Sequence, residues 1–456
     1  MTKPHRNKLT KNLTWLAGAA AAVVAAQAHA EIAGDSLINK LEQKGVLSAD
    51  EAKELRAENQ QDFNNSVTNS LGKAYAKIND MPSWVNNYKI SGDFRGRYDQ
   101  INALDNDNAV DRVRFRYRLR FGIVANILDN MEVGFRLGSG DSGGNALSNN
   151  TTLENNATKK PIWLDAAYAK WTALDNGDWL LAATIGKINN PFNFTPMVFD
   201  PDLTPEGAAI NGGYNFNDRH TLAFTGVAFV LDEESANTHD PFLYGGQVAL
   251  NSKWNSKLSS SVGVGAFQIV NPAQLTTGNV PYNNRGNSRN AAGALLYNYN
   301  PIIADASVTY TFDSAPFYAG KFPVKLAGEY INNPAAHDNN DGYWAGVTFG
   351  KSGKKNTWDL SYRYEYLQAD AWYDQVVDDD NAAFYQNAPS GGGAAGVYGG
   401  TNLKGHLVKL NYSITDYLTF TLTGYITDVI NNRAYNNVAE PDSNTVHFMA
   451  DVMWKF

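Results

Sequence analysis

From residue 88 onward, apolar and polar side chains alternate at every second position in a series of short stretches. Successive side chains of a β-strand point to opposite faces, so each stretch predicts a strand with one apolar and one polar face. In the last stretch Val446, Phe448 and Trp454 share one face, and His447 and Asp451 share the other. The pattern predicts sixteen strands, with fourteen or eighteen as alternatives, near residues 88–99, 112–125, 130–138, 162–173, 179–189, 207–216, 219–231, 242–254, 257–270, 293–312, 321–331, 342–351, 357–369, 402–413, 417–428 and 445–456.

The connections between these stretches alternate strictly between short and long. Short, turn-rich links such as 217–218 and 415–416 alternate with long polar segments such as 139–161 and 190–206. A transmembrane up-and-down barrel requires this arrangement, because its periplasmic turns are tight and its outer loops long. A sandwich or a propeller does not impose it. The predicted fold is therefore all-β, a closed antiparallel transmembrane β-barrel with a water-filled lumen, unless loops or the N-terminal helices block that lumen.

The first 83 residues follow other patterns. A basic start, an apolar run over 13–26 and Ala28-His29-Ala30 predict a signal peptide, residues 1–30. That run is too short to span a bilayer, and no later stretch is long enough, which excludes a helical membrane protein. Residues 31–83 predict a periplasmic helical segment with a capping box at Ser48 and Glu51. Its apolar stripe over 63–78 packs on itself or the barrel rim, mediates self-association, contacts the cell wall or plugs the lumen. Residues 84–456 form the predicted barrel.

Composition narrows the class of protein further. With no cysteine, no disulfide framework holds the exported chain together, so backbone pairing must do so. Aromatic residues make up 12% of the chain and there are 39 glycines, which favours strands and tight turns over helices. The formal net charge is −8, and removal of the four basic residues of 1–30 makes it about −12. This acidic balance argues against a nucleic-acid partner.

Several features together resemble the Gram-negative "putative porin" family over essentially the whole chain. They are the signal peptide, the Leu-rich stretch 37–47, the sixteen-strand rhythm, the stretch 200–207 and the terminal Phe456. In outer-membrane barrels such a terminal aromatic belongs to the signal read by the barrel assembly machinery, so Trp454 and Phe456 are assigned to it. The resemblance implies a location in the outer membrane, contact with lipid and lipopolysaccharide, and a homotrimer.

Arginines dominate the polar face of the second predicted strand. Five alternate with apolar residues over 112–121, and each would cost roughly 2–4 kcal/mol facing lipid near the midplane, so they must face water. Two interpretations stay open. Either Asp93, Asp99, Asp111 and Glu132 neutralise these arginines, or they form a basic ladder that attracts anionic solutes. The predicted pore-lining residues are Arg95, Arg97, Arg112, Arg114, Arg116, Arg118, Arg120 and Arg136.

A proline-rich acidic segment over 190–206 is expected to supply the negative charges that face these arginines. By resemblance to general porins, this loop folds into the barrel and narrows it, which assigns Asp200, Asp202 and Glu206 to a constriction. Acids facing the arginine wall would set an electric field across the pore. The stretch 220–231 is apolar on both faces and is expected behind the folded loop.

The sequence contains no zinc, P-loop or Gly-x-Ser-x-Gly motif. Acidic runs at 105–108 and 378–380 have oxygen ligands for calcium, but hydrated loop acids are far commoner. We therefore expect no enzyme activity, no metal and no cofactor. The predicted function is a porin that passes small hydrophilic solutes by diffusion. The alternatives are a substrate-specific anion channel, such as one for phosphate, and an adhesin or barrel enzyme.

Overall fold

A computed structural model describes residues 38, 40–42, 44, 47–48, 50–55, 85–104, 111–128, 130–235, 238–282, 285–385, 396–431 and 444–456. The chain divides into two units, Met1–Asn87 and Tyr88–Phe456. The predicted signal peptide and the apolar stripe over 63–78 lie outside the described residues, as does the acidic run at 105–108. Within the described part of the chain, no helix is long and apolar enough to cross a bilayer.

In the first unit, helical residues are described at 38, 40–42 and 50–55. The predicted capping box is confirmed. The backbone N–H of Ser48 donates to Oε2 of Glu51 at 2.8 Å, and the N–H of Glu51 donates to Oγ of Ser48 at 3.3 Å. These two bonds satisfy backbone donors that a helix N-terminus leaves without intrahelical partners.

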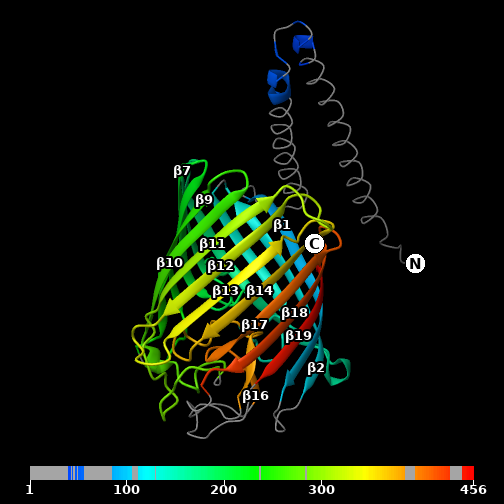
Figure 1. Cartoon of the computed structure of the whole chain (residues 1–456). Helices are drawn as coiled ribbons and strands as arrows, with labels where there is room; N and C mark the ends of the chain where they lie inside the picture. The colour runs from blue at the N-terminus through cyan, green and yellow to red at the C-terminus, as the bar shows by residue number, and fades with distance from the viewer. Residues whose placement is uncertain are drawn as a thin grey trace, which may run out of the picture. The chain divides into compact units, whose positions relative to one another are not determined.

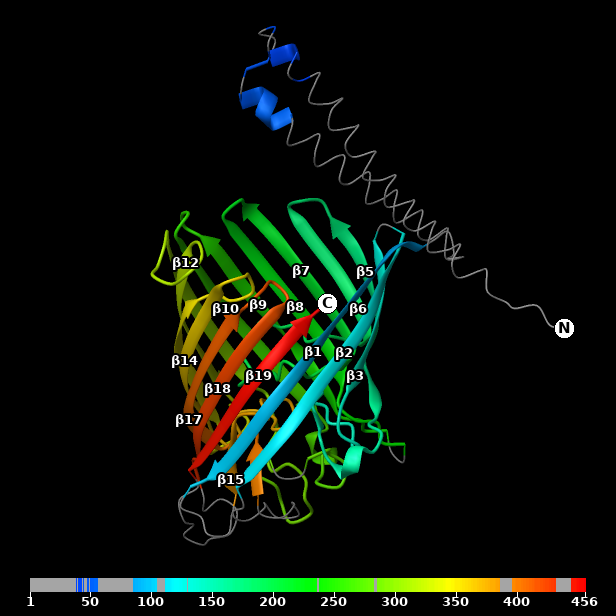
Figure 2. The same ribbon diagram turned by 90° about the vertical axis from the view of Figure 1, so that its right-hand side faces the viewer.

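The second unit is a closed antiparallel barrel of sixteen long strands in the described ranges (Figures 1 and 2). They are β1 (Val85–Ala103), β2 (Arg112–Ile127), β3 (Met131–Ser139), β5 (Ile162–Asp175), β6 (Trp179–Lys187), β7 (Glu206–Asn217), β8 (His220–Val230), β9 (Phe242–Lys253), β10 (Leu258–Val270), β11 (Ile302–Phe312), β12 (Phe322–Asn332), β13 (Asp341–Gly350), β14 (Thr357–Leu367), β17 (Leu403–Ser413), β18 (Leu418–Val429) and β19 (Thr445–Lys455).

Closure comes from pairing of the first strand with the last, which lie side by side in Figure 2. Their register runs from Asp93 opposite Lys455 to Ala103 opposite Thr445. Beyond it, Gly92 and Phe456 exchange backbone hydrogen bonds of 2.8 and 3.0 Å. The pairing leaves no open sheet edge among the sixteen described strands, and hydrocarbon would penalise such an edge by several kcal/mol for each unpaired group.

Short turns and long loops alternate around the barrel as predicted. One expected boundary is wrong, because the strand predicted over 293–312 begins only at Ile302. Residues 293–301 belong to a loop instead, and two of their apolar side chains enter a core: Leu295 is 6% exposed and Tyr299 fully buried. Alternation alone does not distinguish a strand from a loop that buries apolar residues.

The long loops carry the remaining elements: the two-residue strand β4 (Thr151–Thr152), which pairs with β2, the 3-10 turns η1 (Asn155–Ala157) and η2 (Pro272–Gln274), and a hairpin of β15 (Ala382–Tyr385) and β16 (Gly396–Gly399). The hairpin packs against β18 and β19. Phe384 donates its backbone N–H to Oγ1 of Thr445 on β19 at 3.0 Å.

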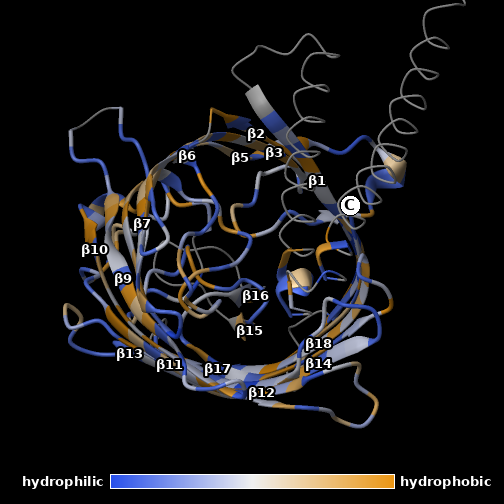
Figure 3. Ribbon diagram, turned by 90° about the horizontal axis from the view of Figure 1, so that it is seen from above, coloured by the Kyte–Doolittle hydropathy of each residue, from blue (hydrophilic) through white to orange (hydrophobic). Residues whose placement is uncertain are grey.

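Hydrophobic and hydrophilic residues are interspersed along the strands of the wall, as Figure 3 shows by colour, and the exposed fractions show which face each kind takes. Outward side chains are large, apolar and uncovered; Phe115 is 58% exposed and Leu326 56%. Their neighbours in the strands are polar or charged and point inward, as Arg118 and Lys325 do. This division is what a wall between lipid and water requires.

Part of the lumen holds an apolar core made by three long loops, which we call the third (188–205), fifth (271–301) and seventh (368–402). Phe192 and Phe199 of the third loop contact Phe267 of β10 at ring-centroid distances of 5.1 and 5.7 Å. Trp372 of the seventh loop joins them at 6.0 Å from Phe199. Phe229 of β8 is only 1% exposed beneath Phe192. The expectation that 220–231 lies behind a folded third loop is confirmed.

Candidate functional site

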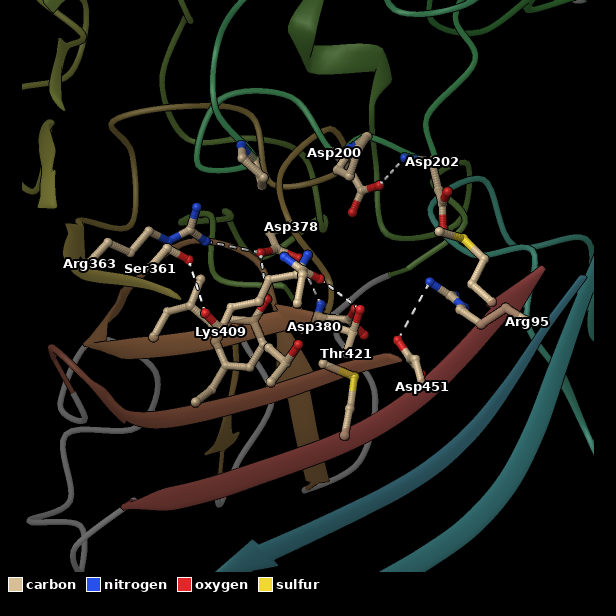
Figure 4. A pocket seen from close by; sticks show the side chains of 18 of the residues that line it. Arg95, Asp200, Asp202, Ser361, Arg363, Asp378, Asp380, Lys409, Thr421 and Asp451 are labelled. Atoms are coloured by element: carbon tan, nitrogen blue, oxygen red, sulfur yellow. Dashed lines mark hydrogen bonds and ion pairs between the residues drawn. The ribbon is translucent and has the colours of Figure 1, made fainter. Parts of the chain in front are cut away.

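The apolar core occupies one side of the lumen, against β8 to β12. Along the wall from β12 through β14, β17 to β19 and on to β1 and β2, a polar cavity of about 680 Å³ remains. Figure 4 shows this cavity from close by, with loop aspartates such as Asp202 and Asp378 and wall arginines such as Arg95 and Arg363. Because the apolar core fills one side of the lumen, the open space lies along the strands that carry the arginines.

Two arginines of β2 hold the third loop at the wall. Arg118 contacts Asp202 at 3.1 Å, and Arg120 contacts the same carboxylate at 3.4 Å. Both arginines also pair with Asp93 of β1 at 2.9 Å. The two-residue spacing along β2 sets both guanidinium groups on the inward face, so one loop carboxylate reaches both.

Arg97 of β1 connects the wall to the seventh loop. Its guanidinium makes a two-point contact with Asp451 of β19, at 2.8 and 3.0 Å, and reaches Asp380 at 3.3 Å. Its neighbour Arg95 donates to Oδ1 of Asn150 in the second long loop at 2.7 Å and lies 4.0 Å from Asp451. Two loops and two adjacent strands therefore converge on this part of the cavity.

The other predicted arginines lie at different places. Asp99 pairs with Arg114 at 2.9 Å and with Arg116 at 3.6 Å. Arg136 of β3 pairs with Asp165 of β5. Arg112 is exposed at the start of β2 and has no ion-pair partner in the described ranges.

Glu206 differs from the other two acids expected at the constriction. It is the first residue of β7, its side chain is 65% exposed, and it pairs with Lys187 at 3.0 Å. It contacts none of the arginines of β1 and β2 within the described chain.

Three aspartates from two loops form a compact carboxylate cluster. One oxygen each of Asp200, Asp378 and Asp379 lie within 4.8 Å of one another. Asp200 accepts backbone hydrogen bonds from Asp202 at 2.7 Å and Asp379 at 3.4 Å. This spacing suits a shared cation or a shared proton.

The cluster changes the acidity of its members. Burial and the charges of Asp379 and Asp378 raise the pKa of Asp200 well above its ordinary value. Burial, together with Asp380 and Asp378, raises the pKa of Asp379 to about 7. Burial also acts to raise the pKa of Asp380, but Arg97, His447 and Arg95 outweigh it and lower that pKa to about 2. Asp380, which follows the cluster in the seventh loop, is therefore anionic at neutral pH where it contacts Arg97.

The seventh loop was not assigned to the site from the sequence. It is fixed by Trp372, whose Nε1–H donates to the Val198 carbonyl at 2.8 Å, and by Asn287, whose amide donates to the carbonyls of Ala369 and Trp372 at 2.7 Å. The available signal was the pair of apolar dipeptides at 372–373 and 376–377 beside the acidic run 378–380. A solvated loop would not be expected to contain them.

Carboxylate partners of the arginines were only partly foreseen. Asp93 and Asp99 are partners as expected, but Glu132 accepts a hydrogen bond from the Tyr168 hydroxyl at 2.7 Å instead. Asp202, expected opposite the arginine wall, is also a partner, and Asp141, Asp165, Asp380 and Asp451 are additional partners that the sequence did not indicate.

Residues 104–291 match the model of a family described as "Putative porin". No curated protein sequence matches the chain. Among solved structures, OprB of Pseudomonas putida is similar at 10% identity and TM-score 0.45 in its low-pH form, over 84% of this chain and 97% of that one. Its high-pH form gives 11% identity and TM-score 0.49, over 85% and 97%. A triple mutant of the Rhodopseudomonas blastica porin gives 10% identity and TM-score 0.40, over 81% and 100%. The family match and the closed sixteen-strand barrel support a porin of the outer membrane.

Proposed function

We propose that the protein is an outer-membrane porin through which small hydrophilic solutes diffuse passively, with its path narrowed by the third and seventh loops. The observation that carries this proposal is the meeting of Asp202 with Arg118 and Arg120 inside a polar cavity. A closed barrel with apolar residues outside and charged residues inside supplies the wall that such a path needs.

The chemistry of the narrow part favours small polar solutes. Aspartates on the loops and arginines on the wall set an electric field across the path, and such a field is strong where water is sparse. A polar solute offers hydrogen bonds to both sides and replaces the water it displaces, whereas an apolar solute leaves charged groups unsolvated. Conduction needs many weak contacts rather than one tight site, and no energy source.

The test is the conductance of the purified, folded protein in planar bilayers, together with liposome swelling in sugars of increasing size. We expect ion current and swelling that declines steeply with sugar size. Asp202→Asn removes the loop charge beside Arg118 and Arg120, so we expect the anion-to-cation permeability ratio to rise roughly twofold. Glu206→Gln is the matched control, because this acid borders the same loop but pairs with Lys187.

A folded barrel that carried no current would contradict the channel assignment and favour an adhesin or a barrel enzyme. If Glu206→Gln also raised the anion-to-cation permeability ratio twofold, the effect would be due to the overall charge of the protein and not to the constriction.

A further inference from the structure

The arginines that line the cavity are all matched by carboxylates. Arg95, Arg97, Arg118, Arg120 and Arg363 each have an aspartate oxygen within 4.0 Å. Asp200, Asp378 and Asp379 add further acidic groups to the same region. Because paired charges of opposite sign cancel at distances larger than their separation, this part of the path has little net attraction for a distant anion.

Three lysines line the same cavity without a carboxylate at ion-pair distance, and Asp305 of β11 acts on Lys325 from farther away. They are Lys325 of β12, Lys409 of β17 and Lys455 of β19, and none has an ion pair within the described ranges. Their strand neighbours face outward: Leu326, Val408 and Trp454 are 56%, 47% and 45% exposed. Alternation along a strand then sets the three lysines on the inner face.

These lysines lie toward the end of the barrel that carries the short turns. Lys325 is near the start of β12, Lys409 near the end of β17, and Lys455 is the last residue of β19. The neighbouring inward side chains that line the cavity include the neutral Ser361, Thr419 and Thr421. The nearby acid Asp359 accepts hydrogen bonds from Asn411 at 2.7 Å and from the backbone of Ser352 at 2.9 Å.

We propose that Lys325, Lys409 and Lys455 form a vestibule that attracts small anions and sets the charge preference of the channel. The proposal rests on the proposed porin function and names its favoured solute class, small anions, with multiply charged ones favoured most. Lysine suits the task because its ammonium is a hydrated, mobile point charge that holds an anion weakly and releases it quickly. Each charge acts over a Debye length of about 8 Å at physiological salt, and the low-dielectric walls of the lumen extend that reach along the cavity that the three lysines share.

The position of the vestibule gives it a direction. Short turns of outer-membrane barrels face the periplasm, so the lysines stand at the inner exit, beyond the charge-matched narrow part. An anion that has passed the narrow part meets a region of favourable potential before it leaves. The lysines would therefore raise anion occupancy on the periplasmic side and favour anions over cations of equal size.

The experiment compares the wild type with the triple variant Lys325→Gln, Lys409→Gln and Lys455→Gln in planar bilayers, as reversal potentials in a KCl gradient. We expect the anion-to-cation permeability ratio to fall roughly threefold or more. Lys354→Gln is the control, because Lys354 lies in a turn at the same end, has an 81% exposed side chain and pairs with Asp416. Its ratio should equal that of the wild type.

A second measurement adds inorganic phosphate to the KCl solution. Phosphate should reduce the chloride current of the wild type and reduce it less in the triple variant. Retention of the heat-modifiable gel shift reports folding; if the triple variant lacks it, Lys409→Gln alone is measured. An unchanged permeability ratio in a folded, conducting variant overturns the vestibule and leaves the porin function intact. Absence of current in the wild type overturns the porin function itself.

Discussion

Asp379 of the seventh loop contacts an acidic residue of the third loop. Its backbone N–H donates to Asp200, and its carboxylate lies near those of Asp200 and Asp378. Buried carboxylates so close together cannot all ionise without repulsion, so protons are retained in the folded protein at pH values where an exposed aspartate has lost its own. The contact between the two loops therefore depends on pH through this cluster.

The sign of that dependence follows from the raised pKa of Asp379, which is about 7 in the folded protein against an ordinary 3.8. The folded state binds the proton more tightly, so its stabilising effect is full below about pH 4 and is lost as the pH rises to about 7. Asp379→Asn should reduce the fall of the thermal midpoint between about pH 5 and pH 8. Asp313→Asn, at an exposed carboxylate that pairs with Lys257, is the control. An identical pH profile in wild type and Asp379→Asn would refute the expectation.

At the scale of elements, the strands follow from local information and the interior loops do not. Apolar and polar residues alternate within each strand, so sequence reasoning locates all sixteen strands, and most ends agree within one or two residues. It also predicts which side of β2 carries arginines. The carboxylate partner of Arg97 in the seventh loop lies 283 positions away in the sequence. No local pattern encodes that contact, because it depends on how three loops pack together inside the closed wall.

Trp372 is the residue on which this loop packing depends most. Its side chain is fully buried, donates to the Val198 carbonyl and contacts the rings of Phe199 and Phe267. Trp372→Ala should cost about 3–5 kcal/mol of loop stability. We expect the third loop to loosen, so liposomes should swell in larger sugars than the wild type admits. Phe317→Ala, at a 98% exposed aromatic of a turn, is the matched control. An unchanged size limit in Trp372→Ala would show that the loop holds its place without this side chain.

At the scale of the whole molecule, closure of the barrel depends on one seam. Phe456 exchanges two backbone hydrogen bonds with Gly92, and its ring packs over the Cα of that glycine, where a Cβ would overlap it. The absence of a side chain at residue 92 thus admits the aromatic ring at the seam. Trp454 adds a ring contact with Phe94 of β1 at 5.9 Å.

Phe456→Ala should lower the fraction of chain that reaches the closed state, because it removes this contact and the aromatic assigned to the assembly signal. The measurement is the intensity of the heat-modifiable band in outer-membrane fractions, with a several-fold decrease expected. Tyr417→Ala, which removes a 69% exposed aromatic at the same end of the barrel, is the control. Equal band intensities for the wild type and Phe456→Ala would exclude a role for this residue in assembly.

The one-sided loop core gives the cylinder unequal stiffness around its circumference. Strands β8 to β12 are braced from inside by packed rings, whereas β1 and β2 are joined to the seventh and third loops through ion pairs. Lateral pressure from the bilayer would therefore be absorbed mostly by the second arc. Fluctuations of that part of the wall should then cause most of the current noise. The noise should increase at high salt, which weakens the ion pairs.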